Sequence, residues 1–135
     1  MNRDEEYIIP TILESLQASL AASMPSTDKL LFFASPWSAP AWMKTSGKLE
    51  GGGIKPEMLE VYAAYLGRFV DEYAKRGITI SAITPQNEPL SSQTYPSAFF
   101  PPEEEAKLIK NYLGTAWGCL NSTGFIISNF SIFTS

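Results

Sequence analysis

Apolar side chains recur every three or four positions in three stretches of the chain, which is the spacing of amphipathic helices. These stretches predict helices over residues 10–24, 57–76 and 102–113. Gly77 and Gly114 directly follow the second and third stretches. Glycine commonly supplies the left-handed conformation that ends a helix, which we expect at Gly77, and Gly114 lies just past the end of the third stretch.

The middle helix carries paired charges on the face opposite its apolar stripe. Asp71 precedes Lys75 by four positions, and Glu72 precedes Arg76 by the same distance. Opposite charges at this spacing lie one helical turn apart and attract each other. We therefore predict two ion pairs on this face.

Two continuous apolar runs alternate with the predicted helices. They cover residues 29–35 and 78–84 and are rich in leucine, phenylalanine and isoleucine. Runs of this kind are typical of strands that are buried on both faces, as in parallel sheets. The alternation of helix and strand predicts an α/β fold with parallel strands joined by crossover helices.

Two parallel strands do not make a closed core, because a parallel sheet needs helices over both of its faces. We therefore expect residues 1–115 to be part of a larger α/β domain. We expect residues 116–135 to be a divergent tail, which is either a fragment of a further strand or foreign to the domain.

Composition removes several classes of function. The 135 residues carry a net charge of -4, so no basic surface indicates nucleic-acid binding. The chain has no histidine and one cysteine, Cys119, so we expect no histidine-based nucleophile, no internal disulfide and no metal or cofactor site. Acid–base chemistry falls to carboxylates, tyrosines or lysines. We also expect no signal peptide, and no apolar run approaches the roughly 18 residues of a membrane span.

The polar residues that follow the two apolar runs suggest carbohydrate chemistry. The first run leads to Trp37, and the second leads to Gln86, Asn87 and Glu88. Loops that leave the carboxyl ends of parallel strands face a common crevice. An indole beside an amide and a carboxylate suits a pyranose, whose C–H faces stack on aromatic rings while its hydroxyls form hydrogen bonds.

Glu88 has two interpretations from the residues alone. Its place between Pro85 and Pro89, after an apolar strand, allows partial burial that would raise its pKa and suit a catalytic acid. A single glutamate in a loop is more often a solvated surface residue.

Two long segments resemble glycoside hydrolase family 30, the glucosylceramidase and endo-β-1,6-glucanase family. They are "FFASPWSAPAWMKTSGKLEGGG" and "YAAYLGRFVDEYAKRGITISAITPQNEPL". The resemblance implies a partial (β/α)8 TIM barrel in which residues 29–35 and 78–84 are the third and fourth strands. It also implies a retaining mechanism with two glutamates and a β-sandwich attached to the whole family domain.

The resemblance assigns roles to particular residues. It implies that Glu88 is the general acid/base, that Asn87 contacts the sugar 2-hydroxyl, and that Trp37 and Tyr95 line the sugar pocket. The family's nucleophile belongs to the seventh strand, and we expect no residue of this chain to replace it. The glutamates at positions 103–105 are explained by the dipole of the helix that they begin.

The remaining aromatic residues are expected to pack in the core rather than to bind sugar. They are Trp42 and the tyrosines of the 57–76 helix.

The implied function is that of a fragment of a retaining β-glycosidase acting on β-glucosides such as glucosylceramide, in a secreted or lysosomal-type compartment. Two alternatives remain: a glycan-binding fragment without catalysis, and endo-β-1,6-glucanase specificity. A flavodoxin-like module is set aside, because the glycines at positions 51–53 lie far from the preceding strand and no Lys-Ser/Thr follows them.

Overall fold

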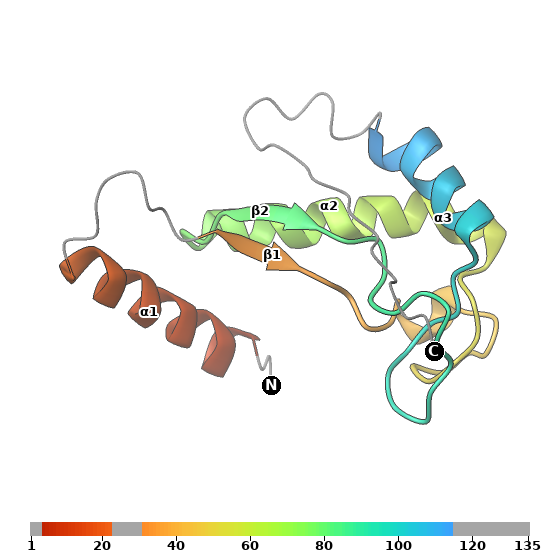
Figure 1. Cartoon of the computed structure of the whole chain (residues 1–135), viewed down its shortest axis with the longest axis horizontal. Coiled ribbons are helices and arrows are strands. Elements are labelled where there is room, and N and C mark those ends of the chain that lie inside the picture. The colour runs from red at the N-terminus through yellow and green to blue at the C-terminus, as the bar shows by residue number, and fades with distance from the viewer. Residues whose placement is uncertain (1–3, 23–30, 115–135) are drawn as a thin grey trace, which may run out of the picture.

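The computed structural model describes residues 4–22 and 31–114, which form the alternating elements predicted from the sequence. A π-helical turn, Asp4–Ile8, leads into the first helix, and a second π-helical segment, Ile109–Leu113, continues the last one. The main elements in chain order are α1 (Ile9–Ala21), β1 (Phe32–Ala34), α2 (Leu59–Lys75), β2 (Ile80–Ile83) and α3 (Pro102–Leu108) (Figure 1). The predicted order is confirmed, and both strands are shorter than predicted.

The two strands form a parallel pair, as the alternation of elements predicted. Phe32 pairs with Ile80 and Ala34 pairs with Ile83, with a shift of register after Phe32. Beyond the strands, the Thr84 amide donates a hydrogen bond to the Ala34 carbonyl at 3.0 Å. The hydroxyls of Ser35 and Thr84 lie 2.7 Å apart. The carboxyl ends of the two strands therefore meet at the same edge of the sheet.

Helix α2 connects β1 to β2 and runs alongside them (Figure 1). Its apolar stripe is buried in the main core of the described residues together with Ile80 and Ile83 of β2. The buried members of this stripe are Leu59, Tyr62, Ala63, Leu66, Val70 and Tyr73. Gly77 follows with a φ of 81°, which confirms its predicted role in ending the helix.

The prediction that the first strand is buried on both faces is wrong for this structure. Phe33 is 75% exposed, and Leu31 just before the strand is 77% exposed. The sheet described here has only β1 and β2, so these side chains meet no further strand or covering helix among residues 4–22 and 31–114. Strand β2 is better covered, with Ile80 and Ile83 both buried.

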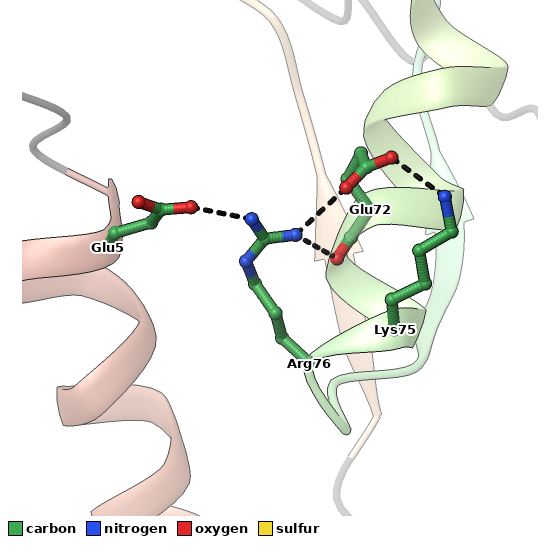
Figure 2. Close-up of polar contacts among 4 residues, drawn as sticks. All are labelled: Glu5, Glu72, Lys75 and Arg76. Carbon is green, nitrogen blue, oxygen red and sulfur yellow. Dashed lines mark hydrogen bonds and ion pairs between the residues drawn. The ribbon is translucent and has the colours of Figure 1, made fainter.

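The ion pairs at the end of α2 differ in part from the predicted ones (Figure 2). Glu72 pairs with Arg76 at 2.9 Å, as predicted. The predicted pair of Asp71 with Lys75 is wrong, because the Lys75 ammonium lies 2.8 Å from Glu72 instead. Arg76 also reaches Glu5 at 2.5 Å and so links the end of α2 to the turn before α1. No helix in the described part of the chain is long and apolar enough to cross a membrane.

Candidate active site

Two long loops leave the shared carboxyl edge of the strands (Figure 1), and backbone hydrogen bonds join them. The β1 loop covers residues 35–58, and the β2 loop covers residues 84–101. The Asn87 amide donates to the Pro36 carbonyl at 2.9 Å, close to the sheet. Farther out, the amides of Ser97 and Phe99 donate to the carbonyls of Leu49 and Gly52. These bonds hold the loops together over most of their length.

The predicted sugar-binding aromatics, Trp37 and Tyr95, come together from the two loops. Their ring centroids lie 5.7 Å apart with an interplanar angle of 52°. Trp37 is 57% exposed and Tyr95 is 45% exposed, so each ring keeps an accessible surface. The pair therefore offers an apolar wall, built from both loops, on which a ligand can stack.

Gln86 joins the two loops next to Trp37. Its side chain is buried, and its amide nitrogen donates to the Trp37 carbonyl at 2.8 Å and to the Asn87 carbonyl at 2.9 Å. The two carbonyls belong to the predicted sugar-binding tryptophan and to the predicted sugar-contacting asparagine. Sequence reasoning placed Gln86 at the strand end without giving it this role.

The turn that carries Gln86 is also held from the helix side. The buried Tyr62 hydroxyl of α2 donates to the Pro85 carbonyl at 2.9 Å. Burial raises the pKa of Tyr62 well above its usual range, and the nearby Tyr65 and Glu105 raise it further. The hydroxyl therefore keeps its proton and remains a donor to Pro85 over a wide range of pH.

Glu88 follows with an unusual backbone and an exposed side chain. Its φ of 46° makes it the only non-glycine residue in the described part of the chain with a positive φ. Its carbonyl accepts a hydrogen bond from the Ser91 amide at 2.9 Å, which closes the turn. The partial burial suggested by its flanking prolines is not found, because the described residues leave Glu88 open to solvent. Left-handed conformations in non-glycine residues are strained and are concentrated at functional sites.

Lys44 is a fully buried cation between the two loops that sequence reasoning did not identify. Its ammonium donates to the Ser38 hydroxyl at 2.9 Å, to the Leu49 carbonyl at 2.6 Å and to the Ser97 carbonyl at 2.5 Å. Burial lowers the pKa of Lys44, and the negative charge of Glu50 partly opposes this effect.

The expectation that Trp42 packs in the core is wrong. Its side chain is 58% exposed, and it lies in a short 3-10 turn, Ala41–Met43, in which Met43 takes the buried position. The packing role is confirmed for the buried Tyr62 and Tyr73 of α2. Tyr65 stacks on Tyr62 at 6.4 Å and remains 46% exposed.

The acidic start of α3 also differs in one respect from the prediction. Glu103 is exposed, as a dipole-stabilising charge would be, whereas Glu105 is buried and lies close enough to Tyr62 to raise its pKa. Residues 4–22 and 31–114 contain no group of three or more acidic or cysteine side chains that could hold a metal ion. Cys119 lies outside these residues.

The fold is that of part of a (β/α)8 barrel, and the candidate site residues lie at the carboxyl ends of the strands. Comparison with known sequences gives the family. Residues 2–125 match the glycosyl hydrolase family 30 TIM-barrel domain, and the chain belongs to this family.

Individual relatives support this assignment. The chain is 36% identical to an endo-1,6-β-D-glucanase of Aspergillus fumigatus, in a match that covers 73% of the chain and 24% of that protein. It is 34% identical to the lysosomal acid glucosylceramidase of Mus musculus, over 84% of the chain and 22% of that protein. Among solved structures, SrfJ from Salmonella typhimurium superposes with a TM-score of 0.79 and 31% identity, covering 93% of the chain and 27% of SrfJ. The chain thus spans about a quarter of the length of its relatives.

Proposed function

We propose that this chain supplies the acid/base part of the catalytic centre of a retaining β-glycosidase that acts on glucosyl groups. The observation that carries the proposal is the arrangement at the carboxyl edge of the strands. There the Trp37–Tyr95 pair and the Asn87–Glu88 turn are tied together by the buried amide of Gln86. Family membership supports a glycoside as the substrate.

Glu88 is the general acid/base in this proposal. In the first step a nucleophilic carboxylate attacks the anomeric carbon, the glycosidic bond breaks, and Glu88 gives its proton to the departing oxygen. In the second step Glu88 takes a proton from water while the water oxygen attacks the same carbon and releases the nucleophile. The exposed Glu88 side chain is free to reach a bound substrate.

The nucleophile in this proposal comes from a part of the barrel other than the described residues. A retaining glycosidase needs its two carboxyl groups roughly 5 to 5.5 Å apart. Glu103, at the start of α3, is an exposed residue that complements the helix dipole and is not assigned this role.

The other site residues hold the sugar. Trp37 and Tyr95 stack against the apolar C–H faces of the ring, for which their exposed surfaces are available. The half-buried Asn87 donates from its side-chain amide to the sugar 2-hydroxyl, a contact that strengthens in the transition state. A glucosyl group fits both named relatives, since one is a glucosylceramidase and the other a glucanase. Within this class we propose a β-glucoside of the glucosylceramide type, with a 1,6-linked glucan as the alternative.

A chimera tests this function. The aligned segment of the Aspergillus glucanase is replaced by the matching part of this chain, so that the host provides the rest of the barrel. We expect the chimera to hydrolyse a β-glucoside with a poor leaving group, and we expect Glu88→Gln to lower kcat by roughly 10²- to 10⁴-fold, the usual contribution of general acid catalysis. Glu103→Gln is the matched control and should leave the rate unchanged. Equal rates for Glu88→Gln and its parent would refute the role of Glu88.

The 135-residue chain by itself is expected to show no turnover. Hydrolysis by the purified chain that Glu88→Gln abolishes would contradict the proposal that the nucleophile lies elsewhere. Titration of the same chain with glucose oligomers, followed by tryptophan fluorescence, examines the alternative of a glycan-binding fragment. A saturable change that Trp37→Ala removes, with no hydrolysis, would favour that alternative.

A further inference from the structure

Lys44 is a cation at a buried position, where the loss of hydration costs free energy. The residue is fully buried, and transfer of an ammonium group from water into a protein interior is unfavourable unless hydrogen bonds compensate for the lost hydration. Hydrogen bonds offset part of this cost, because an ammonium has three N–H donors and Lys44 Nζ has three oxygen acceptors at 2.5 to 2.9 Å. The loops around Lys44 therefore provide an acceptor for every donor of the ammonium.

The three acceptors come from separate points of the two loops. Ser38 directly follows Trp37, Leu49 lies midway along the β1 loop, and Ser97 lies two residues after Tyr95 in the β2 loop. The backbone bonds between the loops already fix Leu49 against Ser97. The Ser38 hydroxyl donates to the Leu49 carbonyl, and Lys44 reinforces this tie between the start of the β1 loop and the pair by donating to all three residues.

The hydrogen bonds of Ser38 show how Lys44 connects the two loops. The Ser38 hydroxyl has one proton, which it donates within the β1 loop toward the carbonyls of Ala39 and Leu49. Its oxygen accepts from Lys44, which also donates to the Ser97 carbonyl in the β2 loop. A single ammonium thus connects the neighbour of Trp37 to the segment that carries Tyr95.

A direct chemical role for Lys44 does not fit this geometry. Its side chain is inaccessible to solvent, and all three of its donors are engaged by protein oxygens. A substrate bound at the exposed Trp37 and Tyr95 rings would not reach a buried ammonium. Lys44 acts through the residues that it holds.

We propose that Lys44 is a positioning residue that sets the spacing of Trp37 and Tyr95 and so preorganises the aromatic wall. That this wall binds a sugar rests on the proposed function, whereas the control of its geometry by Lys44 does not. A preformed wall avoids the entropy cost of ordering two aromatic side chains when a ligand binds.

The experiment uses the full 135-residue chain and NMR contacts between the Trp37 and Tyr95 ring protons. We expect Lys44→Met, which keeps the length of the side chain but has no donors, to lose these contacts while the amide signals of α2 stay in place. Lys48→Met is the matched control, because Lys48 is an exposed lysine of the same loop, and it should leave the contacts unchanged. Aminoethylation of Lys44→Cys in denaturant, with Cys119 replaced by serine so that position 44 holds the one thiol, restores an ammonium at the same reach, and after refolding the contacts should return.

Contacts of undiminished intensity in Lys44→Met would overturn the proposal. If Lys44→Met does not fold, Ser38→Ala tests the same link, because it removes the Lys44 acceptor next to Trp37 together with the bonds that the hydroxyl donates to Ala39 and Leu49. We expect weakened Trp37–Tyr95 contacts in that variant, and full retention would overturn the proposal. These readouts need no sugar, so a failure of Lys44 to control the wall is distinguishable from a failure of the wall to bind glucosides.

Discussion

The two ends of helix α2 hold their polar side chains in opposite ways. Near its start, the buried Tyr62 donates to the turn of the β2 loop that carries Gln86, and both side chains are shielded from water. At its end, Glu72 pairs with Lys75 and Arg76, and Arg76 pairs with Glu5, in a network that solvent reaches (Figure 2). The difference separates two tasks. The buried bonds fix the geometry of the site, whereas the exposed ion pairs add a small, salt-sensitive contribution to stability.

This division agrees with the usual organisation of a (β/α)8 barrel. Functional groups gather at the carboxyl ends of the strands, and the opposite face serves stability. The substitutions that follow alter one end at a time, at Gln86, Tyr62 and then Glu72, from the largest expected change to the smallest.

Replacement of Gln86 should have the largest effect on stability. Gln86→Leu leaves the carbonyls of Trp37 and Asn87 without their side-chain donor, and because each lost hydrogen bond costs about 1 kcal/mol, we expect a loss of about 2 kcal/mol. Urea denaturation of the full chain measures the change in free energy of unfolding. A loss below about 0.5 kcal/mol would show that the amide does not join the loops.

The pH dependence of the stability of Gln86→Glu tests the same hydrogen bonds. Only the neutral carboxyl group keeps a proton to donate, and burial next to two carbonyl oxygens should raise its folded-state pKa above the unfolded value. The stability of this variant relative to the parent should therefore be greatest below the unfolded pKa and fall as pH rises through the folded pKa. A relative stability that does not change with pH would contradict this account.

Removal of the Tyr62 hydroxyl should have an intermediate effect. Tyr62→Phe keeps the buried ring and deletes the hydrogen bond to Pro85, so we expect a loss of about 1 kcal/mol in unfolding free energy. Tyr65→Phe is the matched control, because Tyr65 is half exposed on the same helix and no hydrogen bond of its hydroxyl is found in the described part of the chain. Equal losses of unfolding free energy in the two variants would mean that the hydrogen bond to Pro85 does not contribute to stability.

The ion-pair end of α2 should give the smallest change. Hydrogen bonds from Lys75 and Arg76 hold the pKa of Glu72 well below its usual range, at about 2. A carboxylate with a lowered folded-state pKa adds stability above its unfolded pKa, and this stability is lost as pH falls toward the folded pKa. As pH is lowered from about 5 to about 2, we expect the thermal midpoint of Glu72→Gln to fall slightly less than that of the parent.

High salt provides the control for this prediction. About 1 M salt shortens the screening length to roughly 3 Å and should reduce the difference between the parent and Glu72→Gln at pH 7. A difference as large as that of Gln86→Leu would erase the contrast between the two ends of α2.

The elements that follow a regular period were predictable from the sequence. The 57–76 pattern located α2 closely, because its apolar stripe and the glycine that ends it are local signals. The exposure of Phe33 was not predictable, since an apolar run shows what a strand is suited to bury and does not show whether its neighbours are present.

The sequence predicted the residues of the candidate site but not the buried groups that hold them in place. The resemblance to the family brought together Trp37, Tyr95, Asn87 and Glu88, and the structure shows the aromatic pair in contact. Lys44 escaped notice because lysines in polar loops are usually solvated, and no periodic signal marks a buried cation inside an irregular loop. The positive φ of Glu88 was equally invisible, since a left-handed glutamate is imposed by the surrounding turn.

The most direct test of the central claim is azide rescue of Glu88→Ala in the glucanase chimera. With a dinitrophenyl β-glucoside, the leaving group departs without a proton, so the first step proceeds and the second step lacks its base. Azide needs no base, and we expect it to restore turnover and to yield β-glucosyl azide. A Glu88→Ala chimera that is folded, cleaves this substrate at the parental rate and shows no response to azide would contradict the assignment of Glu88 as the acid/base.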